Sequence, residues 1–440
     1  MLNKLYRYLP VFLQNILVSM KGFQIQRTRF NKNFIRYLEE YEKSNPDNIN
    51  EKTLRKFLVN AQKSIFWKER FETYNINLQD ENIIEEIKKL PILTKDEVQE
   101  NLESIKINTI NDKIIKSQTG GTTGKGLVFQ KTQTMENKQW AIWWRYRRRH
   151  GIQLNTWMGW FGGKVIIDVT NKKPPFWRIN YPGKQIMFSQ YHLNKDTVNL
   201  YYDEIINKKI KWLHGYPSFL AYFANLIKEK KLPNLVMDYV TIGAENLLAH
   251  QILIIQEVFG VKPIQHYGLA EGVANISQLP NGELQIDQDF ALLELVPADF
   301  DKDVFRIIGT NYSNDSFPLI RYDTKDLAQV EVQNGRKRII SIDGRKEDYI
   351  TLPNGNKLGR LANIFKNAIN VNEAQIYQPN INNIIIKIVK NTNYKTTDES
   401  SLLKECRDRF GRDINITFQY VSNIEKTNSG KLRYVISDVK

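Results

Sequence analysis

The first hundred residues follow a helical pattern. Apolar positions recur at helical spacing over residues 24–100, among many Lys and Glu, which predicts a helical lead-in within residues 1–100. Towards its end, Thr94 is a good N-cap residue and Glu97 stands at the spacing of a capping box. We therefore expect a helix to begin at this point.

Beyond residue 110, short apolar runs alternate with amphipathic segments. Strands are expected at 112–117, 127–130, 157–161, 164–168, 186–188, 239–242 and 263–266, and helices at 132–150, 196–207, 218–230 and 247–259. This alternation predicts a parallel sheet covered by helices. Ligands of such a sheet bind beyond the carboxyl ends of its strands, where the turns at 243–245 and 267–272 fall.

The last third of the chain has a different pattern. Residues 284–342 are mostly strand-like, and the turn signal Asp343-Gly344-Arg345 is the best place for a domain boundary. A helix, a strand, a helix and a strand are then expected at 358–369, 383–389, 401–410 and 414–420. We predict an α/β fold, with a large N-terminal domain of helix-covered sheets (1–343) and a small α+β C-terminal domain (344–440).

Composition narrows the class of protein. The 440 residues are 41% hydrophobic and 11% aromatic, enough for packed cores. A single cysteine, Cys406, excludes an internal disulfide framework and a Cys-rich metal site, and the five His lack metal-ligand spacing. These features are typical of a protein of the reducing cytoplasm.

The net charge of +15 does not by itself indicate a nucleic-acid partner. The excess is spread along the whole chain, and no nucleic-acid-binding motif accompanies it. The arginines at 145 and 147–149 lie beside aromatic residues, a combination that can bind nucleic acid. Because they precede Gly151, where cations suit a helix C-terminus, we favour a packed helix with a solvated basic end.

The N-terminal segment leaves two interpretations open. Its apolar run is interrupted by Gln14 and Asn15 and is too short to span a membrane. One helical face carries Leu9, Leu13, Ile16 and Leu17, with Arg7, Lys21 and Arg27 nearby. This face could rest on the inner surface of an anionic membrane or pack on the body of the protein, and packing is favoured.

A Gly/Thr-rich loop is the strongest chemical signal in the chain. Residues 119–126 read Thr-Gly-Gly-Thr-Thr-Gly-Lys-Gly, between two predicted strands. Glycines let a backbone approach a ligand closely, and their N–H groups can form a nest for anionic oxygens. The spacing from Gly120 to Gly124 and the Gly126 after Lys125 exclude a Walker loop. A phosphate-binding loop is favoured over a flexible surface turn.

The order of several motifs resembles the adenylate-forming (acyl-CoA synthetase-like) superfamily, nearest to its phenylacetate–CoA ligase and CapK-type capsular polysaccharide biosynthesis branch. The resemblance extends over residues 5–436. The matching motifs are the Ser/Thr/Gly phosphate loop at 119–125, the adenine-pocket turn at 243–245, the aromatic-Gly-x-Thr-Glu motif at 267–271, the ribose motif at 322–326, the hinge at 344–348 and the C-terminal Gly430-Lys431.

The resemblance implies a set of site residues. The catalytic residues are Lys431, Glu271 and Arg345, and Glu271 is also the magnesium ligand. The nucleotide-binding residues are Thr119, Gly120, Gly121, Thr122, Thr123, Gly124, Lys125, Gly243, Ala244, Glu245, His266, Tyr267, Gly268 and Asp326. Singly, Asp326 is more often a turn carboxylate, Arg345 a surface ion-pair partner and Lys431 a solvated charge.

The implied chemistry suits these residue types. A carboxylate and ATP, held with Mg²⁺, would form an acyl-adenylate while the small, mobile domain brings Lys431 to the reacting oxygens. The acceptor would be CoA or a glycan-linked amine or hydroxyl. Three departures from the motifs leave the substrate open: Ala270 replaces Thr or Ser, and Asp323 and Lys325 replace Arg and Gly.

Two other functions stay open. Within enzymes, the alternative is nucleotidyl transfer, in which AMP itself ends on the acceptor. Outside enzymes, it is a non-catalytic, membrane-associated scaffold of polysaccharide assembly.

Overall fold

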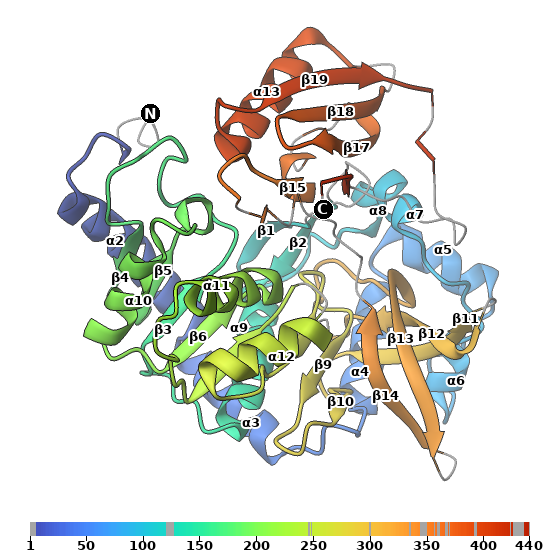
Figure 1. The fold of residues 1–440 in the computed structure, drawn as a ribbon. Helices are drawn as coiled ribbons and strands as arrows, with labels where there is room; N and C mark the ends of the chain where they lie inside the picture. The colour runs from blue at the N-terminus through green and yellow to red at the C-terminus, as the bar shows by residue number, and fades with distance from the viewer. Residues whose placement is uncertain are drawn as a thin grey trace.

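The structure is a computed structural model of the chain (Figure 1). It describes residues 6–119, 127–244, 247, 249–298, 301–333, 336–343, 350–355, 357–358, 361–365, 368, 370–390, 394–422, 424–425 and 435–439.

The helical lead-in is confirmed. It comprises α2 (Val11–Arg29), α3 (Lys32–Lys43), α4 (Glu51–Ala61), α5 (Ile65–Thr73), α6 (Ile83–Ile87), α7 (Lys95–Glu100) and α8 (Leu102–Ile105). The predicted capping box opens α7, because Thr94 Oγ1 accepts from the Glu97 N–H and Glu97 Oε2 accepts from the Thr94 N–H, at 3.2 and 2.9 Å. Among the described residues, no helix has both the length and the hydropathy to cross a bilayer.

A five-stranded, mainly parallel sheet forms the middle of the chain. Its order is β4 (Trp177–Asn180), β5 (Gln185–Phe188), β3 (Met158–Phe161), β6 (Trp212–Gly215) and β7 (Tyr239–Ile242). Only the β4–β5 pair is antiparallel. The expected parallel sheet is thus present, with β4 added at its edge.

Successive side chains of a strand point to opposite sides of its sheet, and helices cover both faces of this one. The helices are α9 (Gln133–Arg149), α10 (Val198–Asn207), α11 (Pro217–Glu229) and α12 (Ala249–Phe259). Leu213 packs in one cluster with residues of α10–α12, whereas its neighbour Trp212 packs in another with residues of α3 and α9. Figure 1 shows α11 and α12 lying across the sheet.

A seven-stranded antiparallel sheet adjoins the first. Its order is β11 (Leu292–Ala298), β12 (Asp301–Thr310), β13 (Tyr322–Gln333), β14 (Arg336–Asp343), β10 (Leu284–Ile286), β9 (Asn275–Gln278) and β8 (His266–Gly268). Two isolated bridges join it to its surroundings, from Thr241 of β7 to Ile264 and from Leu93 to Tyr322. The strand-rich character expected for residues 284–342 is confirmed.

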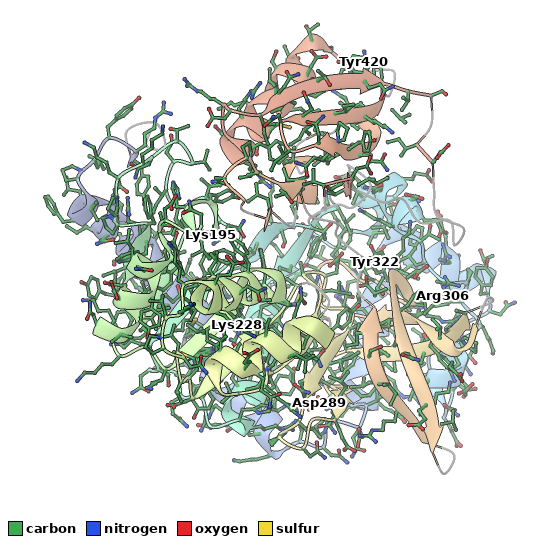
Figure 2. The ribbon with its side chains drawn as sticks, viewed as in Figure 1. Lys195, Lys228, Asp289, Arg306, Tyr322 and Tyr420 are labelled. Carbon is green, nitrogen blue, oxygen red and sulfur yellow. The ribbon has the colours of Figure 1, made fainter. Side chains whose placement is uncertain are left out.

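The C-terminal part builds a separate four-stranded sheet of order β19 (Asn415–Tyr420), β18 (Asn383–Lys390), β17 (Val371–Asn380) and β20 (Val435–Ser437). Helix α13 (Thr396–Phe410) packs against it through Leu402, Cys406 and Phe410. Figure 2 labels Tyr420 on β19, above the rest of the molecule. The same cluster takes in Tyr191 of the short helix η1 (Gln190–His192), so the sheet's core reaches the body of the protein.

Several predicted elements were wrong. Residues 164–168 form no strand, although Ile166 and Ile167 are buried in the core of the five-stranded sheet. Where a helix was expected at 358–369, the described residues form the 3-10 helix η2 (Leu361–Phe365). It follows a small pair of strands, β15 (Ile350–Thr351) with β16 (Lys357–Leu358). Strands β4, β6, β9, β17 and β20 were not predicted.

Candidate functional site

The base of the Gly/Thr loop is held by both backbone and side chain. Strands β1 (Ile114–Gln118) and β2 (Val128–Thr132) pair antiparallel on either side of it. The Thr119 N–H donates to the Leu127 carbonyl, and the Leu127 N–H donates back to Thr119 Oγ1, each at 2.9 Å. The loop residues Gly120, Gly121, Thr122, Thr123, Gly124 and Lys125 lie outside the described residues.

Tyr267 and Asp326 meet, although they come from different strands. The Tyr267 hydroxyl on β8 donates to Asp326 Oδ2 on β13 at 2.8 Å. Asp326 is buried and is held by a local turn, in which its N–H donates to Thr324 Oγ1 and the Thr324 hydroxyl donates to the Ile307 carbonyl. Lys325 between them has a φ of +62°. The ribose and aromatic motifs are thus brought together.

Glu271 is the last residue of the aromatic motif and is buried, with 6% of its surface exposed. Its carbonyl accepts from Asn311 Nδ2 at 3.1 Å. Gly272 follows with a φ of +68°, and a Cβ there would clash with the end of Met135. A side chain at Gly268 would also crowd His266, Asn275 and Trp143, so this turn needs its glycines on steric grounds.

One hydrophobic cluster lies behind three of the predicted motifs. Leu127 at the end of the Gly/Thr loop and Tyr322 of the ribose motif are among its buried members, and Ala270 beside Glu271 packs against it. The methyl group of Ala270 therefore has a packing partner where the motif usually carries a hydroxyl. Asp323, which replaces the Arg of the motif, pairs with Arg306, whose NH2 lies 2.7 Å from Asp323 Oδ2. Figure 2 labels Arg306 on the seven-stranded sheet.

The turn after β7 lies next to β8. Ala244 has a φ of +71°, and a Cβ at Gly243 would lie 3.9 Å from the His266 carbonyl oxygen. The His266 ring stacks on Tyr146 with centroids 4.7 Å apart, and its Nε2 contacts Asn275 Oδ1 at 2.9 Å. Burial, with the nearby Arg147 charge, lowers the pKa of His266 to about 3. His266 is consequently neutral at physiological pH.

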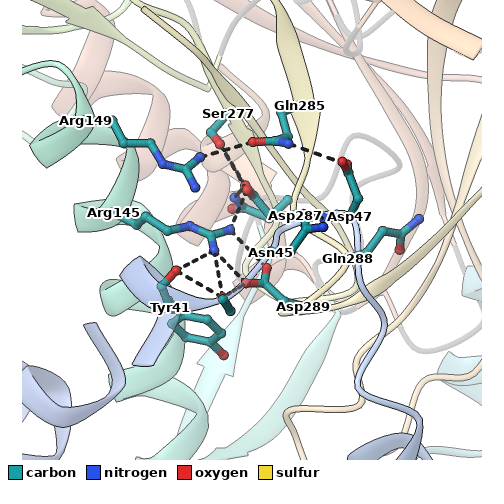
Figure 3. A network of polar contacts seen from close by, with 12 residues as sticks. Tyr41, Asn45, Asp47, Arg145, Arg149, Ser277, Gln285, Asp287, Gln288 and Asp289 are labelled. Carbon is teal, nitrogen blue, oxygen red and sulfur yellow. Dashed lines mark hydrogen bonds and ion pairs between the residues drawn. The ribbon is translucent and has the colours of Figure 1, made fainter. Parts of the chain in front are cut away.

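The basic end of α9 is only partly solvated, which corrects the sequence interpretation. Arg145 is 1% exposed and reaches Asp287 Oδ1 at 2.7 Å and Asp289 Oδ2 at 2.5 Å. Figure 3 shows its guanidinium between these carboxylates and the Tyr41 carbonyl. Arg147 is also buried, whereas Arg148 is exposed. The arginine run therefore does not form a continuous basic surface.

Other predicted residues lie outside the described part of the chain. These are Glu245 of the adenine turn, the hinge segment 344–348 with Arg345, and Lys431. Their positions stay predictions. Among the described residues there is no group of three or more His, Cys, Asp or Glu side chains suited to hold a metal ion.

Sequence reasoning missed His214 and Arg147 as neighbours of the site. His214 lies on β6, and its Nδ1 contacts Thr241 Oγ1 on β7 at 2.9 Å. Burial, with the charge of Arg147, lowers the pKa of His214 to about 3. The segment His214-Gly215-Tyr216-Pro217 offered a signal, because Pro is common at the first position of a helix and so marks the carboxyl end of the preceding strand, where ligands of such sheets bind.

Comparisons with known proteins agree with these features. Residues 350–438 match the CapK C-terminal domain family. Protein CapK of Staphylococcus aureus is 27% identical over 462 residues, covering 100% of both chains. A 2-hydroxyisobutyryl-CoA ligase in complex with 2-HIB-AMP and CoA matches in fold with a TM-score of 0.53 at 14% identity, covering 89% of each chain. The same enzyme with 2-HIB-AMP, in its postadenylation state, matches with a TM-score of 0.50 at 14% identity over 88% of each chain. The protein is therefore a full-length homologue of Protein CapK that carries a CapK C-terminal domain and has the fold of the adenylate-forming acyl-CoA ligases.

Proposed function

We propose that this protein uses ATP to activate a carboxylic acid and then transfers the acyl group. In the first step a carboxylate oxygen attacks the α-phosphorus, the new bond gives an acyl-adenylate, and the bond to pyrophosphate breaks. In the second step a CoA thiol, or an amine or hydroxyl of a glycan precursor, attacks the acyl carbon and AMP leaves. The observation that carries this proposal is the Tyr267–Asp326 pair beside the cluster shared with the Gly/Thr loop.

The described residues suit these roles. The Asp326 carboxylate can accept hydrogen bonds from ribose hydroxyls, and Tyr267 offers a ring face to the adenine. Glu271 supplies one hard oxygen ligand, which fits Mg²⁺, because this ion usually keeps several waters and binds substrate phosphates. Bound there, Mg²⁺ would offset phosphate charge. The Gly/Thr loop would hold the β- and γ-phosphates, and Lys431 would approach the carboxylate.

The CapK resemblance supports a role in surface-polysaccharide assembly, with a cytoplasmic, membrane-peripheral location. The second candidate is AMP transfer to an acceptor, which the same nucleotide site could serve. A catalytically inactive scaffold is the third.

A screen for pyrophosphate release separates these functions. Purified protein would be incubated with ATP, Mg²⁺ and a panel of carboxylic acids, with and without CoA, and the products identified by mass spectrometry. We expect release that depends on one class of acid, with acyl-AMP or an acyl product. An AMP-modified acceptor would instead support nucleotidyl transfer. No turnover with any acid or acceptor would support the scaffold.

We further infer that α2 rests on an anionic membrane surface. Its polar side faces the protein, because Asn15 Oδ1 accepts from the Ile179 N–H at 3.0 Å and the Ser19 hydroxyl donates to the Ile179 carbonyl at 3.2 Å. These bonds occupy the open edge of β4. Leu9, Leu13 and Leu17 are only half-buried. The helix therefore packs on the body, as favoured from the sequence, but through its polar residues.

The outer side of α2 is apolar. Its exposed residues are Phe12 (63%), Ile16 (50%), Met20 (59%) and Phe23 (55%), and Tyr181 (57%) lies beside them. With neighbouring residues they line a groove of about 650 Å³. Figure 1 shows α2 at one side of the molecule. A helix that turns large apolar side chains to solvent and polar ones to the protein reverses the usual pattern of a surface helix.

The charge of the N-terminal segment favours an anionic lipid surface as the partner of this apolar face. Residues 1–38 contain no Asp or Glu but seven basic residues, namely Lys4, Arg7, Lys21, Arg27, Arg29, Lys32 and Arg36. Anionic lipids attract each Lys or Arg near the surface by about 1 kcal/mol. An apolar helix face flanked by such residues is typical of interfacial binding.

Vesicle cosedimentation tests this inference. We expect the protein to pellet with phosphatidylserine-containing vesicles and not with pure phosphatidylcholine. The double variant Phe12→Gln, Met20→Gln should lose most of this binding, whereas Val236→Gln, Leu253→Gln, which changes exposed apolar residues elsewhere, should keep it. Binding that survives deletion of residues 1–22, or self-association of the protein without vesicle binding, would contradict it.

A further inference from the structure

Arg147 is a buried cation that has no counter-charge among the described residues. Its side chain is 7% exposed and makes no hydrogen bond or ion pair to any described residue, and its Nε atom is fully buried without a partner. The other strongly buried arginines differ. Arg145 lies between two aspartates, and Arg178 donates to Gln14 Oε1 and to two carbonyl groups. Of these three, Arg147 alone makes neither a hydrogen bond nor an ion pair to a described residue.

Three aromatic rings surround the Arg147 guanidinium. Its guanidinium carbon lies 5.1 Å from the ring centre of Trp144, 5.4 Å from Tyr146 and 5.8 Å from Trp212. The Arg147 charge also contributes to the lowered pKa values of His214 and His266, which keep both rings neutral. These rings partly compensate the cation but supply no negative charge.

The location of Arg147 connects it to the candidate site. His214 precedes Gly215, whose carbonyl accepts from the N–H of Gly243 in the adenine turn at 3.4 Å, and His266 precedes Tyr267. Both histidines are only half-buried. Thr241 Oγ1 accepts from Trp212 Nε1 and lies 2.9 Å from His214 Nδ1, so β7 fixes the orientation of the His214 ring. His214 is thereby held close enough to Arg147 for that charge to affect its pKa.

Burying an unpaired charge is costly, and an anion that pairs with it would recover that cost. We propose that Arg147, with His214 beside it, binds a second anionic group of the acid substrate, distinct from the carboxylate that is activated. The substrate is then an acid with a further carboxylate or phosphate. This inference rests on the proposed function, because it names the substrate class of the same site.

The test compares matched acids in pyrophosphate release. Pairs such as butyrate and succinate differ by one carboxylate, and phosphoglycolate supplies the phosphate case. We expect the wild type to favour the diacid or the phospho-acid in kcat/KM by about 100-fold, because charge-assisted pairs with Arg are strong. In Arg147→Gln this preference ratio should fall about 100-fold. The matched control Arg148→Gln, at an exposed arginine paired with Glu42, should keep it.

Melting temperature provides a readout independent of turnover. A diacid or phospho-acid that raises the melting temperature of the wild type and of Arg148→Gln, but not of Arg147→Gln, supports the anion site. This holds even where no pyrophosphate forms, because the lack of pyrophosphate counts only against the proposed activity. Without ligand, Arg147→Gln should melt no lower than the wild type, since it removes an unpaired buried charge. A wild type that prefers monoacids, or equal stabilisation of all three proteins, would overturn the inference.

Discussion

Two contacts orient Asp326: one comes from a residue of its own motif and the other from a residue that is distant in the sequence. The Thr324 turn lies within its own motif and could be anticipated, but the Tyr267 hydroxyl comes from another strand. The motif order predicts that both residues lie near the nucleotide. Neither their spacing nor their residue types predicted the hydrogen bond between them. Their contact depends on the pairing of the whole seven-stranded sheet.

Tyr267→Phe should weaken ATP binding. The variant keeps the ring but removes the donor at 2.8 Å from Asp326 Oδ2, and a hydrogen bond to a charged group contributes about 1.5 kcal/mol or more. We expect the KM for ATP in the pyrophosphate assay to rise about tenfold. Tyr377→Phe removes a similar hydroxyl that donates to Asp438 at 2.6 Å in the C-terminal part and should leave KM unchanged. Equal KM values in both variants would exclude the role of Tyr267.

The arginines of α9 show where residue-level reasoning fails. Their helix and its end near Gly151 were predicted correctly, since both depend on local sequence. Their burial was not, because Asp287 and Asp289, which pair with Arg145, lie more than a hundred residues further along the chain. A run of basic residues is therefore not evidence of a solvated face.

At the scale of elements, local signals were the most reliable. The capping box of α7 and the Thr132 N-cap of α9 need only neighbouring residues, and both helices were predicted near their true starts. Strand β4 was missed because its outer edge is paired with side chains of α2, Asn15 and Ser19, and not with another strand. No periodicity in β4 itself could indicate this.

The β1–β2 hairpin depends on Thr119. Its hydroxyl accepts from the buried Leu127 N–H at 2.9 Å, across the base of the Gly/Thr loop. Thr119→Val keeps the shape but leaves this N–H unpaired, at a cost of about 1–3 kcal/mol. We expect the loop to loosen and the KM for ATP to rise about tenfold or more. Thr119→Ser retains the hydroxyl and should remain within about twofold of the wild type. A Val variant with wild-type KM would show that the loop does not need this bond.

At the scale of the whole molecule, three histidines with lowered pKa values make stability depend on pH. Burial lowers the pKa of His192 to about 4, and burial with the Arg147 charge lowers those of His214 and His266 to about 3. In the unfolded chain these groups titrate near pH 6.5. Below that pH the unfolded state binds more protons than the folded state, so stability falls as pH falls from about 6.5 towards 4.

Denaturant unfolding at several pH values checks this expectation. Near pH 5.5, replacing His192, which stacks on Phe176, by Gln should reduce the proton uptake on unfolding by about one. The slope of the unfolding free energy against pH would decrease accordingly. A slope identical to that of the wild type would mean that His192 is charged in the folded protein.

The last prediction concerns the C-terminal domain, which the motif order assigns to delivery of Lys431. Lys431→Ala should lower the rate of pyrophosphate release about 100- to 1,000-fold, because one preorganised donor at developing charge contributes about 3–4 kcal/mol. Transfer from a supplied acyl-adenylate to CoA should continue, since that step does not need this lysine at the phosphate. Lys404→Ala, at an exposed position on α13 of the same domain, should affect neither step. Pyrophosphate release at the wild-type rate in Lys431→Ala would remove the lysine from the first step, and loss of both steps would indicate a general effect on the domain.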